Sequence, residues 1–394
     1  MTAVAPVPPV ARTAEEWGEA VRQWRGRAFH AKQIFRWIHA RGVLDPSKMT
    51  DLPASMREAL AGEGLGEVVS IDTERRADDQ TRKILVKLRD GATIETVLIP
   101  NVTGGKSRLP NPVEQDADAA AAVDDEEEEI GNGHGESDQG IARVTQCIST
   151  QVGCAMGCVF CASGQAGLKR HLGADEIVAQ VILGRSRLDA GEQLRNVVFM
   201  GMGEPLHNYD ATARALRLIT HGDGIGLSSR RVTVSTSGLV PEIERLGKDF
   251  AGNIGLAVSL HAADDETRSR LLPINKKYPL PKLMGALRAY PLPHRRRITI
   301  EYTLVAGRND DVSEARKLSR LLRGLPVKIN LIPMNPIADS ALGPPDLTSV
   351  LAFQKVLCDD SYSCFIRRRR GDDVSAACGQ LALAGAKRKI RLVS

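Results

Sequence analysis

The sequence contains no feature that would place the chain in a membrane or send it through one. Its first twenty residues show neither a basic start followed by an apolar run nor a small-residue cleavage site. No later stretch approaches the roughly eighteen uncharged apolar residues that a membrane-spanning helix needs. With 394 residues, 42% of them hydrophobic, the chain can bury a sizeable core. We therefore expect a soluble, cytoplasmic protein.

An even cysteine framework is also missing. The seven cysteines form an odd set, and four of them crowd into the fifteen residues 147–161. Small secreted proteins instead spread paired cysteines along the chain as a disulfide framework. The crowding therefore indicates reduced thiols that take part in metal or redox chemistry.

The segment 114–138 has no lysine or arginine, although eleven of its residues are acidic. Without it, the chain has 53 basic and 37 acidic residues, a balance of +16 against +5 for the whole chain. This surplus suits a polyanionic partner such as RNA, and it also suits simple solubility. The surrounding stretch 101–140 has no apolar face and cannot offset the entropy of ordering, so we expect a disordered loop there.

We divide the chain into four parts. Residues 1–66 should form a helical module like those that bind RNA, because apolar residues recur there at helical spacing. Its basic side chains could contact phosphates, although a solvated helix face is the commoner explanation. Residues 67–100 should form a connection that carries Glu95, with a β-hairpin turning at Asp90-Gly91. The acidic loop occupies 101–140, and residues 141–394 should form the catalytic domain.

The catalytic part alternates between short β-branched runs and helical patterns. The runs are RVTQCIST, NVVFMGMG, RRVTVSTSG, NIGLAVSLH, RRITIEYTLV and KINLIPMN. Alternation of this kind implies right-handed βαβ units around a parallel sheet. Six such runs predict an α/β fold, a partial (β/α)6 barrel, with active-site residues at the C-terminal ends of the strands.

Three cysteines follow the first of these strands at the spacing CxxxCxxC: Cys154, Cys158 and Cys161. A structural zinc site has four protein ligands, and no second CxxC or HxxxH pair follows at a suitable distance. A four-iron cluster held by three cysteines leaves one iron open to a small molecule. The motif, with an aromatic residue before its last cysteine, resembles the radical S-adenosylmethionine (SAM) superfamily, in which the open iron chelates SAM. That resemblance implies a 4Fe-4S cluster and SAM as cofactors.

The next strand ends in the motif Gly201-Met202-Gly203-Glu204-Pro205. Its glycines let the backbone approach a ligand closely, and Glu204 can accept hydrogen bonds from an ammonium group. On its own the motif would usually be a turn. In the superfamily that it resembles, this position binds the amino group of SAM.

Nearly the whole chain resembles one family, the dual-specificity 23S ribosomal RNA and transfer RNA adenine-C2 methyltransferases. The matching stretches are GRAFHAKQIFRWIHARG, IETVLIP, CISTQVGCAMGCVFCASG, VVFMGMGEPLHN, RRVTVSTSG, AVSLHA, LLPINKKYPL, ITIEYTLV, KINLIPMNP and RRGDDVSAACGQL. The acidic segment matches no required element of the family. A collinear series of this kind is far more specific than any single motif.

The adenine ring carbon C2 is electron-poor, so it cannot attack a sulfonium methyl group as a nucleophile. The resemblance implies that the family methylates it by a radical route. One SAM methylates a protein cysteine, and a second is cleaved reductively at the cluster to give a 5′-deoxyadenosyl radical. That radical takes hydrogen from the methylthioether, whose carbon then adds to the adenine. The reductive cleavage of SAM needs an electron donor such as a flavodoxin or ferredoxin system. We expect the enzyme to be a monomer.

The resemblance also assigns roles to individual residues. Cys378 matches the methyl-carrying cysteine, and Cys147 matches the resolving thiol that forms a disulfide with it, although either could be an ordinary buried cysteine. Glu95 matches the general base, although its alternation with apolar neighbours also fits a solvent-facing strand residue. The family's further SAM contacts match Gly203, Ser235, Ser259, Leu260, His261 and Asn335.

The cysteines outside these motifs and the arginine run have plainer explanations. Cys358 and Cys364 match no catalytic position and read as small buried hydrophobes near the last strand. The run 367–370 is a solvated face in many proteins, but beside the reactive thiol it could grip phosphate near a target base splayed out of RNA.

Two other functions stay open at this point. A close relative of the family uses the same chemistry on C8 of the same ribosomal adenine. A non-catalytic, zinc-bearing RNA-binding protein would also carry cysteines and a basic surface. Iron and sulfide in an anaerobic preparation would support the enzyme, and zinc alone would support the binder.

We predict that deleting residues 114–138 leaves folding and turnover nearly unchanged, because a segment without an apolar face contributes little to a core. If the segment competes with RNA for the basic surface, deletion should tighten RNA binding at low salt, and salt should erode the difference. Replacing the segment with a neutral linker of equal length separates its charge from its length. Loss of cooperative unfolding in the deletion variant would contradict the prediction.

Overall fold

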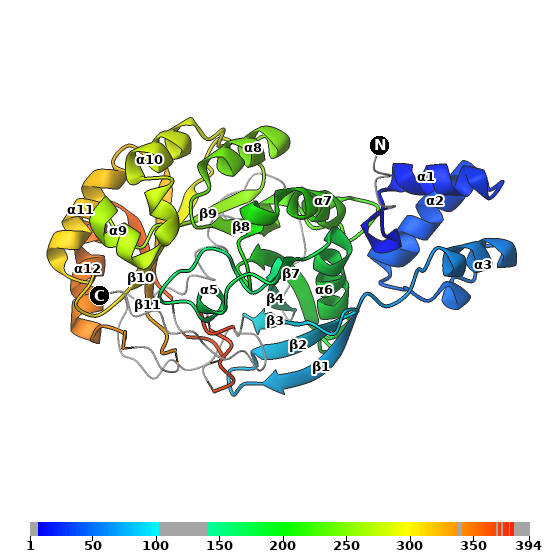
Figure 1. Ribbon diagram of the computed structural model, residues 1–394, viewed down its shortest axis with the longest axis horizontal. Helices are drawn as coiled ribbons and strands as arrows, with labels where there is room; N and C mark the ends of the chain where they lie inside the picture. Colours follow the sequence, from blue (N-terminus) through cyan, green and yellow to red (C-terminus); the bar gives the residue numbers. More distant parts are fainter. Residues whose placement is uncertain are drawn as a thin grey trace.

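The computed structural model describes residues 7–101, 141–337, 341–367, 369–371, 373–377 and 379–381. The acidic segment 114–138 and Cys378 lie outside these ranges, so the expectation of disorder and the predicted disulfide concern residues that are not described. The described part consists of a helical module and a curved sheet with helices around it (Figure 1).

Three helices form the N-terminal module: α1 (Ala14–Gln23), α2 (Ala28–Phe35) and α3 (Ala54–Gly62). Helix α1 begins at a capping box, in which Thr13 Oγ1 accepts from Glu16 N at 3.3 Å and the Glu16 carboxylate accepts from Thr13 N at 2.8 Å. Trp17, Ile34 and Phe35 are buried between the helices. Helices therefore form where the apolar spacing predicted them.

The main sheet of the described residues has ten strands in the order β1-β2-β3-β4-β7-β8-β9-β10-β11-β12. The antiparallel strands are β1 (Val69–Arg76), β2 (Arg82–Leu88) and β3 (Thr93–Pro100). The parallel strands are β4 (Ala142–Cys147), β7 (Glu192–Phe199), β8 (Val232–Thr236), β9 (Gly255–Ser259), β10 (Ile298–Leu304), β11 (Val327–Pro333) and β12 (Ser363–Ile366). Strand β3 joins the two parts because it pairs antiparallel with β4.

The predicted α/β partial barrel is confirmed, with two strands that the sequence patterns did not predict. Strand β1 extends the expected hairpin of β2 and β3 to three strands, and β12 adds a seventh parallel strand after β11. Strand β1 is largely exposed, and β12 has only four residues. Neither therefore has the apolar pattern by which strands are recognised.

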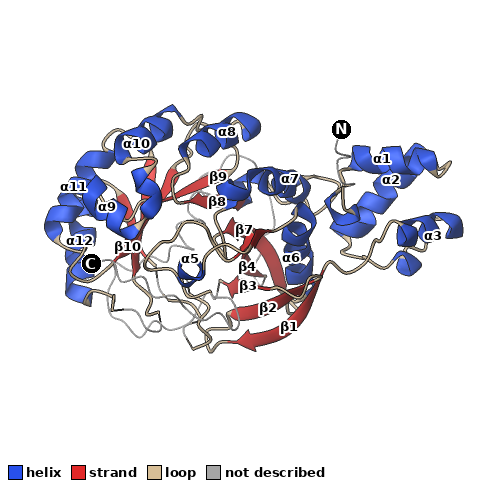
Figure 2. Ribbon diagram, in the orientation of Figure 1, coloured by secondary structure: helices blue, strands red, loops and turns tan. Residues whose placement is uncertain are grey.

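Helices cover the outer side of the curved sheet (Figure 2). They are α6 (Ala174–Ser186), α7 (Tyr209–Thr220), α8 (Val240–Phe250), α9 (Asp265–Leu271), α10 (Leu280–Ala289), α11 (Val312–Leu322) and α12 (Leu347–Asp359). All seven residues of β10 are buried, as expected for a parallel strand covered on both faces. Among the described helices, none combines the length and apolarity that crossing a bilayer requires.

The helical module is packed against the barrel at α6 and α7. Arg214 on α7 donates to the Glu16 carboxylate at 2.8 Å, and Arg185 on α6 donates to the backbone oxygen of His39 at 2.8 Å. Apolar side chains of the module and of the sheet belong to one continuous core. The module is therefore held to the barrel by burial as well as by these polar contacts.

Replacing Trp17 with Ala should lower the free energy of unfolding by about 3–5 kcal/mol, because it removes a fully buried aromatic side chain. Denaturant unfolding followed by circular dichroism measures the loss. Phe29→Ala is the control, since Phe29 is 51% exposed and should cost less than about 0.5 kcal/mol. Equal losses in the two variants would contradict this packing.

Candidate active site

The cysteine loop follows β5 (Gln151–Val152) and returns to β6 (Arg170–His171), which pairs with it. Gly153 permits this return because its φ is +80° and a Cβ there would lie 1.9 Å from Gly167 O. Cys154 N donates to the same Gly167 oxygen at 3.2 Å. Gly153 and Gly167 thus set the entry and exit of the loop.

A short helix, α5 (Ala162–Ala166), supports the loop from behind. Cys161 stands immediately before this helix, and its backbone N donates to Cys158 O at 3.2 Å. A Cβ on Gly164 would lie 2.9 Å from Cys158 N, so this glycine lets the helix pack directly against the loop. Backbone contacts therefore fix the loop, together with the Gln165 side chain, whose Nε2 donates to Val159 O at 2.8 Å.

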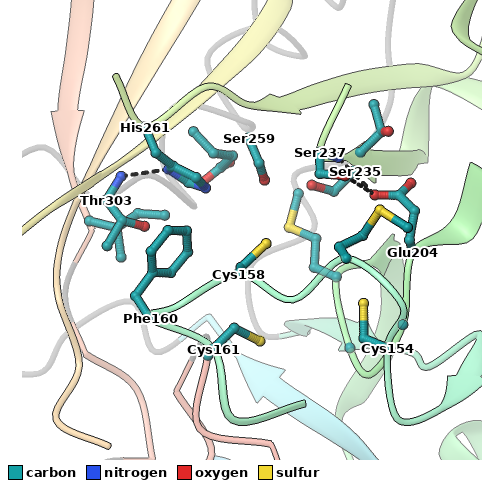
Figure 3. A pocket seen from close by; sticks show the side chains of 18 of the residues that line it. Cys154, Cys158, Phe160, Cys161, Glu204, Ser235, Ser237, Ser259, His261 and Thr303 are labelled. Carbon is teal, nitrogen blue, oxygen red and sulfur yellow. Dashed lines mark hydrogen bonds between the residues drawn. The ribbon is translucent and has the colours of Figure 1, made fainter. Parts of the chain in front are cut away.

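The three thiols lie in one pocket, formed at the carboxyl ends of the parallel strands (Figure 3). The pocket has about 910 Å³ of empty volume and opens to solvent. Its lining includes Cys154, Cys158, Phe160, Cys161, Gly203, Glu204, Ser235, Ser237, Ser259, His261, Glu301, Thr303, Met334 and Asn335. Within the described residues, no three His, Cys, Asp or Glu side chains converge closely enough to hold a single metal ion.

Glu204 is buried at the edge of this pocket and held by hydrogen bonds. One carboxylate oxygen accepts from both Ser237 N, at 2.8 Å, and Ser237 Oγ, at 2.9 Å (Figure 3), and the other accepts from Leu206 N at 3.1 Å. Burial raises the pKa of Glu204, and these hydrogen bonds oppose the rise. The carboxylate thus has a fixed orientation in which a cationic ligand would find an acceptor.

His261 lines the pocket just after the end of β9. Its backbone is in the left-handed conformation, with a φ of +59°. Its Nδ1 accepts from Thr303 N at 2.9 Å (Figure 3), and Phe160 stacks edge-on against its ring at a centroid distance of 4.7 Å. Burial, and then the charge of Arg268, lowers the pKa of His261 to about 3. The imidazole is therefore neutral, with its proton on Nε2.

The cysteine thiols resist ionisation in the absence of a cation. Burial raises the pKa of Cys154 to about 12 and holds that of Cys158 well above its ordinary value, and in both the neighbouring Cys161 adds to the rise. A metal group reverses this effect because it binds the thiolate form. Three cysteines beside an open pocket, one buried and two half-buried, whose thiolates would repel one another without a metal, fit an iron-sulfur cluster of the three-cysteine kind.

Most predicted SAM contacts lie in this pocket. Ser235, Ser259, His261 and Asn335 line it together with Gly203 and Glu204. Leu260 is buried beside the pocket, and its backbone N donates to Glu301 O at 3.0 Å. Phe160 is the aromatic residue already noted in the cysteine motif, whereas Ser237 and Glu301 were not predicted to line the pocket. Ser237 lies in the VSTSG run, two residues after Ser235, and this spacing is the sequence signal that could have identified it as a pocket residue.

Glu95 and Cys147 lie beside the pocket on two adjacent strands. Val97 is directly opposite Cys147 in the antiparallel register of β3 and β4, so Glu95, two residues before Val97, shares the face of Cys147. Glu95 Oε1 lies 2.7 Å from Lys83 Nζ. The solvent-facing alternative for Glu95 is wrong: the side chain is buried, because a later segment of the chain covers this face.

That covering segment consists of the described residues 373–377 and 379–381. Lys83 Nζ donates to Ser375 O at 3.0 Å, Ala162 N donates to Gly379 O at 2.8 Å, and Ser163 Oγ donates to Leu381 O at 2.6 Å. The segment therefore bridges the hairpin strand β2 and the helix that supports the cysteine loop.

The interpretation of the two remaining cysteines is half right. Cys364 on β12 is buried, as expected for a small hydrophobe. Cys358, in the last turn of α12, is exposed, although its thiol is hydrogen-bonded to the side chain of the buried Cys364.

The fold and this pocket define a radical SAM enzyme, and two family models agree. The model of the radical SAM superfamily matches residues 148–318, and that of the "Ribosomal RNA large subunit methyltransferase N-terminal domain" matches residues 14–64. The crystal structure of a radical SAM methyltransferase from Sphaerobacter thermophilus superposes with a TM-score of 0.81 at 39% identity, covering 95% of this chain and 99% of that one.

The chain belongs to the family of dual-specificity RNA methyltransferases called RlmN. The "Dual-specificity RNA methyltransferase RlmN" of Sorangium cellulosum is 68% identical to it over 386 residues, 98% of each protein. The protein of the same name from Syntrophobacter fumaroxidans is 42% identical, over 93% of this chain and 94% of that protein. The chain is thus a radical SAM RNA methyltransferase, and its cofactors are a 4Fe-4S cluster and SAM.

Replacing Gly153 with Ala should sharply lower the iron content after anaerobic reconstitution, because the new Cβ would clash with Gly167 O and displace the cysteine loop. Iron and sulfide per chain are the measurement. Gly226→Ala is the matched control: its φ is +73°, but the nearest atom to its Cβ would be 3.7 Å away. The control should lose about 1–2 kcal/mol of stability and keep its iron. Full iron content in Gly153→Ala would show that the loop tolerates a different path.

Proposed function

We propose that this enzyme methylates C2 of an adenine in 23S ribosomal RNA and in transfer RNA through a methylated cysteine, Cys378. The observation that carries the proposal is the common pocket of the three thiols, Glu204 and the strand-end residues, with the segment around residue 378 bound directly beside it. Both halves of the chemistry, the cofactor site and the methyl carrier, would then meet at one place.

Cys154, Cys158 and Cys161 are the proposed cluster ligands in this scheme. Once bound, the cluster supplies the electron that cleaves SAM. The fixed Glu204 carboxylate suits the ammonium group of SAM, and the neutral His261 can donate from Nε2 without adding charge. Gly203, Ser235, Ser259, Leu260 and Asn335 are the further proposed contacts.

The contacts of the covering segment support Cys378 as the methyl carrier. The neighbouring residue Gly379 accepts from Ala162, the first residue of the helix behind the cysteine loop, at 2.8 Å. Ala376 and Ala377 are buried on the other side of residue 378. The described residues on both sides of position 378 therefore support the proposal through their contacts and burial.

Glu95 and Cys147 are the proposed general base and resolving thiol. A general base needs a carboxylate held in place, and Lys83 Nζ lies 2.7 Å from Glu95 Oε1. Cys147 shares the face of Glu95 on the adjacent strand, beneath the same covering segment. The base and the second thiol would thus reach the adduct from one side.

The partners follow from the charge and the chemistry. The proposed RNA-binding surface includes the N-terminal module, residues 1–66, whose basic side chains such as Arg27 and Arg41 are partly or fully exposed. Residues 141–394 carry the proposed catalytic domain, linked through residues 67–100. We further propose a flavodoxin or ferredoxin system as electron donor, a monomeric state and a cytoplasmic location.

Replacing either of the two cysteines should stop the reaction, but at a different step in each variant. Cys378→Ala has nowhere to place the methyl group, so it should bind RNA and form no covalent adduct. Cys147→Ala should complete the addition to adenine and remain trapped on its RNA. Mass spectrometry after ribonuclease digestion should find a nucleotide on the peptide that contains residue 378 in Cys147→Ala and none in Cys378→Ala. Glu95→Ala should also favour the trapped state.

The control is Cys364→Ala, a buried cysteine outside the pocket, which should turn over without trapping. Nucleoside analysis of the wild-type product distinguishes 2-methyladenosine from 8-methyladenosine. Normal turnover by Cys147→Ala, or an adduct at Cys358, would overturn the assignment of the two thiols. An 8-methyl product would overturn the choice of carbon.

A further inference from the structure

Arg268, on α9, is a fully buried cation beneath the pocket whose hydrogen-bond partners are all neutral. Its exposed fraction is 0%. The guanidinium donates to Leu260 O at 3.0 Å, to Asn275 Oδ1 at 2.8 Å, to Ser237 O at 2.7 Å and to Ser259 O at 3.2 Å. Three of these four acceptors are backbone oxygens at the ends of β8 and β9.

A buried charge is costly unless an opposite charge lies near it. Within the described residues, no carboxylate is within ion-pair distance of Arg268. The nearby Asp265 carboxylate is engaged elsewhere, since one of its oxygens accepts from Asn275 Nδ2 at 2.9 Å and from Leu280 N at 2.7 Å. Hydrogen bonds satisfy the guanidinium, but its charge lacks a direct counterpart.

Arg82 shows how this chain otherwise buries an arginine. Its side chain is also 0% exposed, but it lies 2.6 Å from the Glu192 carboxylate and 3.3 Å from that of Asp189. The two arginines are equally buried and differ in their ionic partners. Arg268 therefore differs from Arg82 in having no ionic partner among the described residues, and not in its burial.

The pocket above Arg268 contains the groups that would carry negative charge once a cluster is bound. The Ser237 and Ser259 carbonyls that it binds belong to residues that line the pocket, and Ser237 in turn donates to Glu204. The helix that carries Arg268 also contacts the cysteine loop, since Val159 N donates to Leu271 O, at the end of α9, at 3.1 Å. Thiolates at Cys154, Cys158 and Cys161 would give Arg268 the negative partner that the protein does not otherwise provide.

We propose that Arg268 is the fixed counter-charge of the cysteine-bound iron-sulfur cluster, held in place by the strand-end carbonyls. The proposal rests on the function proposed above. A fixed positive charge stabilises the reduced cluster more than the oxidised one, since reduction adds one negative charge. Arg268 is thus a positioning residue that eases reduction without touching the substrate.

The test uses the full chain, reconstituted anaerobically and titrated with dithionite in the absence of SAM and RNA. Arg268→Gln removes the charge and keeps a polar side chain, while Arg268→Lys keeps the charge and loses most of the carbonyl contacts. The midpoint potential, followed by electron paramagnetic resonance, should fall in Arg268→Gln by at least a tenfold change in the reduction equilibrium, about 59 mV for one electron. Arg268→Lys should recover most of that shift.

Arg82→Gln is the matched control. It also removes a fully buried guanidinium, so it should destabilise the fold while leaving the potential of the cluster unchanged. A general loosening of the structure would move both variants alike, whereas a charge effect moves only the variant at position 268. If Arg268→Gln does not fold, Arg268→Met provides a neutral side chain without unsatisfied donors for the same measurement.

The outcomes separate this inference from the proposed function. A wild-type preparation that binds no iron and sulfide would overturn the cluster assignment itself. A full cluster whose potential is the same in Arg268→Gln or Arg268→Met as in the wild type would overturn the role of Arg268 alone. An equal shift in Arg82→Gln would reduce that role to general stability.

Discussion

The site depends on parallel strand pairing from β4 to β12, because parallel pairing brings the carboxyl ends of these strands to one edge. The segments that follow β4, β7, β8 and β9 leave that edge and carry the cysteine loop, Glu204, Ser237 and His261. Residues separated by more than a hundred positions in the chain thereby line one pocket. An antiparallel strand in this series would carry its loop to the opposite edge.

A second constraint is the balance of charge in the pocket. Glu204, Glu301 and three thiols gather there, while the histidine is neutral and the fully buried Arg268 lies beneath the pocket. The polypeptide alone thus concentrates groups that prefer a cation in their midst. Much of the order in this region comes instead from neutral hydrogen bonds, as at Ser237, which accepts from Arg268 and donates to Glu204.

Much of this arrangement could be predicted from the sequence, and the exceptions have physical causes. The cysteine spacing, the Gly-rich strand end and the alternating runs identified the fold and most of the pocket, because each is a local pattern. Glu95 could equally have faced solvent, since its burial depends on a segment about 280 residues later in the chain. Arg268 gave no signal because an isolated arginine in a helix is usually exposed, and only tertiary packing encloses it. Strand β12 was too short to recognise.

The segment that covers Glu95 also bears on how the molecule assembles. Lys83 and Ser375 are 292 residues apart in the chain, and Ser163 and Leu381 are 218 apart. Contacts between residues so far apart in the chain form late in folding, because closing a long loop costs entropy before the contacts stabilise the structure. During synthesis the ribosome releases this segment after every strand of the sheet. The pocket that must receive the metal cluster therefore passes through a stage in which its sheet is complete and its cover is still absent, a natural opening for a bulky inorganic group.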